Sequence, residues 1–229
     1  MKTKKLLITS ILVIGTTLFY TSCSKDKETV VPPTPPISDV STPGAGVTFD
    51  GYTYASIILG NGQEWMAENL RTTKFCNGDS IPNGSWVYYN NDSQYENPYG
   101  KLYTWYAVND NRNICPCGWR VPNDADWRLG FFSSGDLNQN GGKMKSTGTQ
   151  YWQSPNTNAT NETGFSGLPG GYRNNGGFFG DIGLMGWWWS SSDAGANNTW
   201  TIALSNTSSA VGRHSQPKGF GVSVRCIKN

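Results

Sequence analysis

The sequence has little charge and almost no histidine. Charged residues make up 15% of the 229 residues, and His214 is the single histidine. A typical domain is about a quarter charged, so this composition excludes a coiled coil, a helical bundle and a nucleic-acid-binding arm. A Ser-His-Asp or Cys-His site would have to use His214. Because His214 lies in a polar stretch typical of a surface hairpin, we expect a solvated side chain and no enzymatic activity.

The sequence is rich in glycine, proline and aromatic residues. The chain has 28 Gly, 12 Pro and 10 Trp, and 13% of its residues are aromatic. Glycine and proline favour turns, while the large rings provide enough apolar area for a core. The composition therefore predicts one loop-rich domain that contains β-structure.

The N-terminus carries the one long apolar run. Leu6 to Tyr20 follows the positive residues Lys2, Lys4 and Lys5, and it is shorter than the roughly 20 apolar residues that span a bilayer. This pattern is typical of a signal peptide. With Cys23 after two small residues, it resembles a bacterial lipoprotein signal, which implies residues 1–22 as the signal and Cys23 as the acylated mature N-terminus. The alternative is an ordinary secretory signal with an incidental cysteine.

The residues after Cys23 suggest an address and a tether. Ser24 to Glu28 resemble the tag that sends some lipoproteins to the outer face of the outer membrane. We therefore expect a lipid-anchored protein at the cell surface, with the periplasmic face as the alternative. Residues 23–46 are rich in Pro, Thr and Ser and favour an extended tether. Periodic apolar sequence then runs through the remainder, which predicts one domain over residues 47–229.

Removal of the signal also changes the charge. Without its three lysines, the chain keeps 15 basic and 16 acidic residues, a formal net charge of −1. A domain this close to neutrality has no electrostatic basis for binding nucleic acid. The partners expected are the membrane, through the lipid anchor, and either a glycan or an envelope protein.

Short alternating segments predict antiparallel strands. Gly60-Asn61-Gly62 separates two apolar runs, which is a hairpin signal. The segments that alternate are Tyr52–Leu59, Glu64–Asn69, Ser85–Tyr89, Trp187–Ser191, Trp200–Leu204 and Gly219–Ile227.

Two segments predict short helices. One is Leu102 to Val108. The other begins after Asn123, whose side chain can cap the helix together with Asp126, and it places Trp127 and Leu129 on the buried side. The fold class is therefore α+β, with two short helices, several short antiparallel strands and long loops.

Six ordered blocks carry a family resemblance. They are Gly62–Leu70, Tyr99–Trp105, Cys115–Pro122, Gly164–Arg173, Trp188–Ser191 and Gly221–Cys226. Together they resemble the Fibrobacter succinogenes major paralogous domain, a family of secreted and lipoprotein modules. The resemblance implies a distant relation to the C-type-lectin-like superfold. Fold alone does not determine function.

Four cysteines follow Cys23, and they allow three disulfide pairings in an oxidising compartment. The family resemblance favours Cys115–Cys226, because these cysteines lie at shared positions, and it leaves Cys76–Cys117 as the second bridge. A zinc site is disfavoured because Cys-x-Cys without a nearby histidine is poor zinc spacing.

One segment is similar to the start of a calcium loop. Asp136, Asn138 and Asn140 occupy its ligand positions, but Thr147 stands where such a loop carries a bidentate Glu. A polar turn is the favoured interpretation, and calcium would bind only weakly. No other cofactor is expected.

Amide-rich segments with aromatic residues supply the candidate ligand contacts. Aromatic faces pack on sugar rings, and amides bond to hydroxyls. The candidates are Trp86, Tyr88, Tyr95, Tyr151, Trp152 and Asn158. We interpret Trp187 to Trp189 as core packing rather than as a sugar platform.

These observations lead to three hypotheses. The first is a cell-envelope lipoprotein with a non-catalytic module that binds a glycan or a partner protein. The second is a structural or assembly lipoprotein of the outer membrane. The third is an enzyme of unknown chemistry at His214.

Overall fold

The computed structural model describes residues 41–132 and 137–229. The predicted signal, Cys23 and Asp136 lie outside these residues. No helix in the described part of the chain has the length and apolar character needed to cross a membrane.

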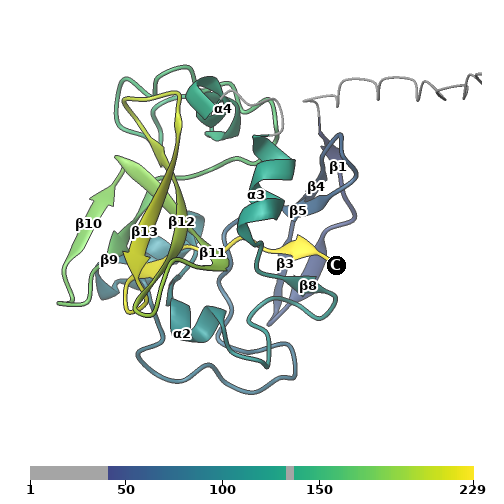
Figure 1. The fold of residues 1–229 in the computed structure, drawn as a ribbon, viewed down its shortest axis with the longest axis vertical. Helices are drawn as coiled ribbons and strands as arrows, with labels where there is room; N and C mark the ends of the chain where they lie inside the picture. Colours follow the sequence, from purple (N-terminus) through teal and green to yellow (C-terminus); the bar gives the residue numbers. More distant parts are fainter. Residues whose placement is uncertain (1–40, 133–136) are drawn as a thin grey trace, which may run out of the picture. The chain divides into compact units, whose positions relative to one another are not determined.

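The strands pair antiparallel in four groups (Figure 1). The first five-stranded sheet has the order β1 (Thr42–Pro43), β4 (Ser56–Ile58), β5 (Glu64–Met66), β15 (Ile227–Lys228), β8 (Trp119–Arg120). The second has the order β10 (Phe179–Ile182), β9 (Gly170–Arg173), β14 (Gly221–Val222), β7 (Leu102–Thr104), β6 (Trp86–Val87). A three-stranded sheet contains β11 (Met185–Asp193), β12 (Asn198–Ser205) and β13 (Val211–Pro217), and β2 (Val47–Phe49) pairs with β3 (Tyr52–Tyr54).

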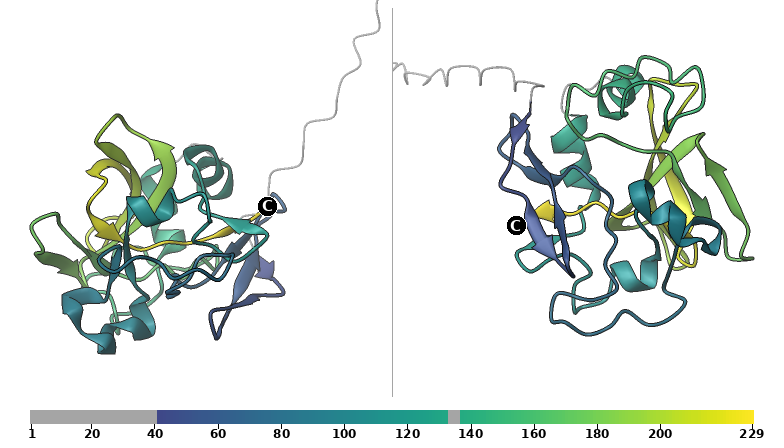
Figure 2. Two further views of the ribbon diagram at one scale, coloured as in Figure 1. Left: turned by 90° about the horizontal axis from the view of Figure 1, so that it is seen from below. Right: turned by 180° about the vertical axis from the view of Figure 1, so that it is seen from behind.

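The helices are short. They are α1 (Glu96–Tyr99), α2 (Trp105–Val108), α3 (Asp124–Phe131) and α4 (Leu137–Met144), with 3-10 turns η1 (Tyr89–Asn91) and η2 (Ser93–Tyr95). The mixed α+β class is confirmed, with β-structure dominant, but the prediction of two helices is wrong. Figures 1 and 2 show the first sheet on one side of the domain and β11 to β13 on the other.

The predicted β-hairpin is present. β4 and β5 pair antiparallel, and Gly62 N donates to Leu59 O at 2.8 Å across the Gly60-Asn61-Gly62 turn. The fold also includes β1, which pairs with β4. The predicted boundary at residue 47 is therefore wrong, because Thr42 and Pro43, assigned above to the tether, join the first sheet.

The last predicted strand is interrupted. Gly219–Ile227 contains β14 in the second sheet and β15 in the first, and the chain between them is buried. This segment joins the two five-stranded sheets, so tertiary contacts replace a continuous ladder. The predicted helix Leu102–Val108 is likewise shortened, because its first three residues form β7 beside β14.

Helix α3 starts as the sequence predicts. Asn123 Oδ1 accepts from Asp126 N at 2.9 Å, and Asp126 Oδ2 accepts from Asn123 N at 2.7 Å. Trp127 is completely buried, but Leu129 is 56% exposed, so its predicted burial is wrong. Trp127 and Phe131 lie four residues apart on the face that packs inward, whereas a residue two positions from Trp127 points away.

The tryptophan triplet on β11 packs into two cores. Trp187 and Trp189 belong to one buried cluster with Ala203, while Trp188 belongs to another with Ile202. Alternation along a strand sends neighbouring side chains to opposite faces, and the predicted core packing is confirmed.

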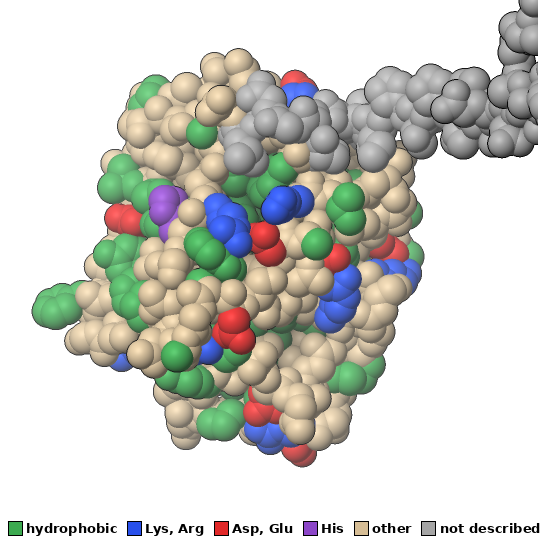
Figure 3. Space-filling view, viewed as in Figure 1, with side chains coloured by type: hydrophobic (Ala, Val, Ile, Leu, Met, Phe, Trp, Pro, Cys, Tyr) green, Lys and Arg blue, Asp and Glu red, His purple; other side chains and the backbone are tan. Residues whose placement is uncertain are grey.

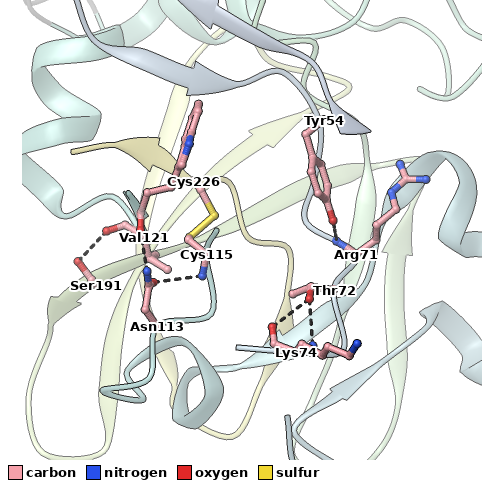
Figure 4. Close-up of a disulfide and its surroundings, with 10 residues drawn as sticks. Tyr54, Arg71, Thr72, Lys74, Asn113, Cys115, Val121, Ser191 and Cys226 are labelled. Atoms are coloured by element: carbon pink, nitrogen blue, oxygen red, sulfur yellow. Dashed lines mark hydrogen bonds between the residues drawn. A yellow bond between two sulfur atoms is a disulfide. The ribbon is translucent and has the colours of Figure 1, made fainter. Parts of the chain in front are cut away.

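Both predicted disulfides are present. Cys115 joins Cys226 across 111 residues, and Cys76 joins Cys117 across 41 residues. Figure 4 shows the first bridge, beside which Asn113 Oδ1 accepts from Cys115 N at 3.1 Å. Together with this bond, the bridge fixes the segment that enters β8 to the buried C-terminal segment.

Candidate functional site

An aromatic pocket of about 260 Å³ lies where several strands meet. Its walls come from β9, β10, β11, β13, the turn after β13, and β14. We use "aromatic pocket" for the hollow lined by Tyr172, Asp181, Trp187, Gln216, Phe220 and Val222.

Three rings form its apolar wall. Tyr172 and Phe220 are stacked, with ring centroids 5.6 Å apart and an interplanar angle of 15°. The Tyr172 ring meets Trp187 edge to face at 6.4 Å. Tyr172 and Phe220 are half-buried, while Trp187 is only 8% exposed, so Trp187 supports the pocket and the other two rings reach its surface.

Asp181 and Gln216 supply the polar part of the pocket. The Asp181 Oδ2 atom accepts a hydrogen bond from Trp187 Nε1 at 3.3 Å. Asp181 has a φ of 65°, and Gly171 on the paired strand also has a φ of 65°. The register of β9 and β10 is continuous here, because Gly180 pairs with Tyr172 and Ile182 with Gly170, which places Asp181 opposite Gly171. The positive φ values of these two facing residues accompany the placement of the Asp181 side chain at the pocket.

His214 lies beside the aromatic pocket on β13. Its ring centroid is 5.2 Å from that of Trp187, and a Cβ on Gly212 would stand 2.4 Å from its Nε2 atom. Glycine therefore makes room for the imidazole. Figure 3 shows the histidine, in purple, at the surface among hydrophobic side chains.

A second hollow, of about 190 Å³, has His214 in its wall, together with Ser205 and Ser208. Within residues 41–132 and 137–229, no hydrogen bond joins the imidazole to a serine hydroxyl or a carboxylate. The arrangement therefore lacks the base-to-nucleophile contact of a catalytic triad.

A buried polar hub lies in the interior. The guanidinium of Arg225, which is fully buried, donates from Nε to Asn69 Oδ1 at 2.7 Å. Its terminal nitrogens donate to the carbonyls of Met66 (3.2 Å), Phe165 (2.5 Å) and Ser166 (3.2 Å). One cation therefore holds three segments together through charge-assisted hydrogen bonds.

Asn69 extends this hub to the remaining sequence blocks. Its Oδ1 also accepts from Trp188 Nε1 at 2.9 Å, and its Nδ2 donates to Tyr99 O at 2.8 Å and Ser223 Oγ at 3.2 Å. The Cys115–Cys226 bridge adds the block that contains Cys115. All six blocks of the resemblance therefore meet around the hub, and they build the interior.

The Fibrobacter succinogenes major domain family matches residues 59–228. The chain belongs to this family. Neither the comparison with curated proteins nor the comparison with solved structures gave a match. Membership in the Fibrobacter succinogenes major domain family accounts for the six blocks, which all lie within the matched residues, but it assigns no ligand.

In this family member, the predicted ligand residues lie in separate places. Trp86 and Tyr88 are neighbours, with centroids 5.6 Å apart, and Lys101 Nζ lies 5.1 Å from each ring. Tyr95 and Tyr151 both contact Tyr99, at 6.3 and 6.1 Å between centroids. Burial raises the pKa of the Tyr99 hydroxyl, so it stays protonated at neutral pH.

The two remaining candidates have different outcomes. Trp152 is completely buried, and its Nε1 donates to Gly167 O at 3.0 Å. Its predicted ligand contact is therefore wrong, because the interior already contacts the whole indole. Asn158 is exposed. The structure does not bring the six predicted residues into one site.

The predicted calcium loop is also corrected. Asn138 and Asn140 lie in helix α4, and Asn140 is buried. Ser209 Oγ donates to the backbone carbonyl of Asn138 at 2.8 Å, which ties the helix to the turn before β13. Neither a calcium loop nor a polar turn is formed by these asparagines, and the described residues contain no cluster of three His, Cys, Asp or Glu side chains suited to a metal.

Sequence reasoning missed the aromatic pocket. Tyr172 lies inside a family block, and Phe220 lies in the predicted strand Gly219–Ile227, directly before another block. Asp181 and Gln216 lie in segments that carry no motif. A search for aromatic residues flanking the glycine-rich turns would have found the two rings, although not their pairing.

Proposed function

We propose that the chain is a cell-envelope lipoprotein whose domain is a non-catalytic module that binds a glycan in the aromatic pocket. The observation that carries this proposal is the convergence of stacked rings, a carboxylate and an amide in one hollow. Aromatic faces pack against sugar rings, and carboxylate and amide groups bond to hydroxyls. The volume of about 260 Å³ is just below the range of about 300–1,000 Å³ typical of drug-sized ligands, so it suits one sugar unit.

The envelope location rests on independent features. Two disulfides fit a secreted or envelope-associated protein, because disulfides persist in oxidising compartments. Acylation of Cys23 would anchor the tether, and multiple acyl chains make such anchoring stable. The proposal includes anchoring in the outer membrane, at its outer face. It also includes a distant relation to the C-type-lectin-like superfold, which the short strands and long connections support.

Binding to immobilised glycans tests this function. The mature chain, purified in detergent with both disulfides formed, is applied to a glycan array, and hits are measured by calorimetry. We expect Phe220→Ala to weaken binding at least tenfold, because it removes half of the stacked pair. Phe178→Ala is the matched control, since Phe178 is 75% exposed and lies outside the pocket.

The same experiment separates the alternatives. If no glycan binds and the protein instead co-purifies with a stable outer-membrane complex, the structural or assembly role replaces the glycan module. Equal loss of binding in both phenylalanine variants would show that the aromatic pocket is not the site.

A further inference from the structure

Asp181 stands apart from the other acidic side chains. Within residues 41–132 and 137–229, every Asp and Glu forms an ion pair except Asp92 and Asp181. Asp92 has a local role, because its Oδ1 accepts from Gln94 N at 2.9 Å and caps η2. The Asp181 carboxylate has one side-chain partner, the neutral indole of Trp187. The aromatic pocket therefore carries an uncompensated negative charge.

The backbone at Asp181 is also unusual. A φ of 65° lies in the left-handed region, which Asp and Asn tolerate better than other residues with a side chain. Such conformations cluster at ligand sites, where the surrounding structure holds them. On the opposite strand, a Cβ on Gly171 would stand 2.2 Å from Gly180 O, so only glycine permits this strand pairing. The fold thus holds the Asp181 carboxylate next to three rings.

Aromatic rings and a carboxylate are complementary to the same group. A cation within about 6 Å of a ring centroid is attracted by the ring quadrupole, most strongly by Trp. A carboxylate accepts charge-assisted hydrogen bonds from an ammonium group. Gln216 adds an amide that can form hydrogen bonds to hydroxyl groups. A sugar carries hydroxyl groups, and a lysine side chain does not.

We propose that the aromatic pocket selects a protonated amine carried on a sugar ring, with Asp181 as its counter-ion and Tyr172, Trp187 and Phe220 around it. The inference rests on the proposed glycan-binding function and names the ligand class: amino sugars with a free amine. An N-acetylated sugar has the same ring but no charge, so it forms only the stacking and hydroxyl contacts.

Calorimetry with two matched oligosaccharides tests the inference. The mature chain is titrated with a glucosamine tetramer and with the N-acetylglucosamine tetramer at neutral pH. We expect the free-amine tetramer to bind at least tenfold more tightly, and the preference to weaken as salt screens the charges.

Asp181→Asn removes the charge but keeps the shape, and asparagine tolerates the left-handed conformation. We expect this variant to bind both tetramers with the affinity that the native chain has for the N-acetylated one. Asp92→Asn is the matched control, because it makes the same substitution at the other unpaired acid and asparagine also caps helices well. The near-UV circular dichroism of the tryptophans checks that each variant is folded.

The outcomes distinguish the two proposals. Equal binding of both tetramers, lost in Phe220→Ala, would overturn the amine selection and leave the glycan function standing. Failure of both tetramers and of the whole glycan array would overturn both proposals. Binding of a tetralysine peptide that depends on Asp181, without binding of the glucosamine tetramer, would overturn the assignment of the amine to a sugar.

Discussion

Replacing Arg225 by methionine removes the guanidinium of the buried hub and keeps a long apolar side chain. The carbonyls of Met66, Phe165 and Ser166 lose their donor, and Asn69 Oδ1 keeps only Trp188 Nε1. Methionine can fill the space beside the Phe165 ring, which the guanidinium now covers at 4.3 Å. The substitution therefore removes hydrogen bonds from buried polar groups but changes the packing little.

The magnitude follows from the groups left unpaired. Each buried carbonyl without a donor costs about 1–3 kcal/mol, while the variant no longer has to bury a charge. Three such carbonyls, offset in part by the charge that is no longer buried, lead us to expect Arg225→Met to lower the free energy of unfolding by about 3–5 kcal/mol. A whole domain has only about 5–15 kcal/mol, so the variant will lie close to the limit of stability.

Urea unfolding followed by tryptophan fluorescence, with both disulfides intact, measures this loss. With a slope of about 1–3 kcal/mol per molar, the midpoint should fall by more than about 1 M. Arg213→Met is the control, because Arg213 stacks on Trp200 at 3.4 Å but its side chain is 42% exposed. The reasoning is refuted if Arg225→Met and Arg213→Met both stay within about 1 kcal/mol of the native chain.

Three further predictions use the same unfolding assay. The Cys115–Cys226 disulfide closes 111 residues, and its removal should cost about 5 kcal/mol in the chain-entropy model. The Cys76–Cys117 disulfide closes 41 residues, and its removal should cost about 4 kcal/mol. A larger loss of stability from the shorter loop would contradict that model here. Burial lowers the pKa of Lys145 to about 8, so the unfolded chain binds this proton more tightly. Stability should therefore rise between pH 8 and the ordinary lysine pKa of about 10.4, and the rise should be absent in Lys145→Met. Asn123→Ala removes the cap of α3 and should cost about 1 kcal/mol, whereas no change would show that Asp126 alone caps the helix.

The elements predicted well are those that local chemistry determines. The cap at Asn123 and the Gly60-Asn61-Gly62 turn depend on residues within a few positions of each other, and both are present. Leu102 to Thr104 has no local feature that distinguishes a strand from a helix, so its pairing with β14 decides. The same holds for Ser223 to Cys226, where bonds to Asn69 and the disulfide replace a continuous strand.

The aromatic pocket depends on pairing that no single segment contains. Asp181 reaches the pocket from a strand position with a positive φ opposite Gly171, which a strand pattern with a period of two does not predict. Trp152 shows the opposite error. Its amide-rich neighbours are typical of a surface loop, but the carbonyl of Gly167 and the adjacent core enclose the indole.

The buried hub and the aromatic pocket use different side chains, although strand β11 contributes to both. On β11, Trp188 points to the hub through Asn69, while Trp187 points to the aromatic pocket through Asp181. Alternation along the strand therefore places one tryptophan at the hub and its neighbour, which also packs in the core, at the wall of the candidate ligand site. Asp181 and Gln216 lie outside all six blocks and make no contact with Arg225. Because the hub supports the strands without using these side chains, substitutions such as Asp181→Asn can change ligand selection while the buried hydrogen bonds that stabilise the fold stay intact.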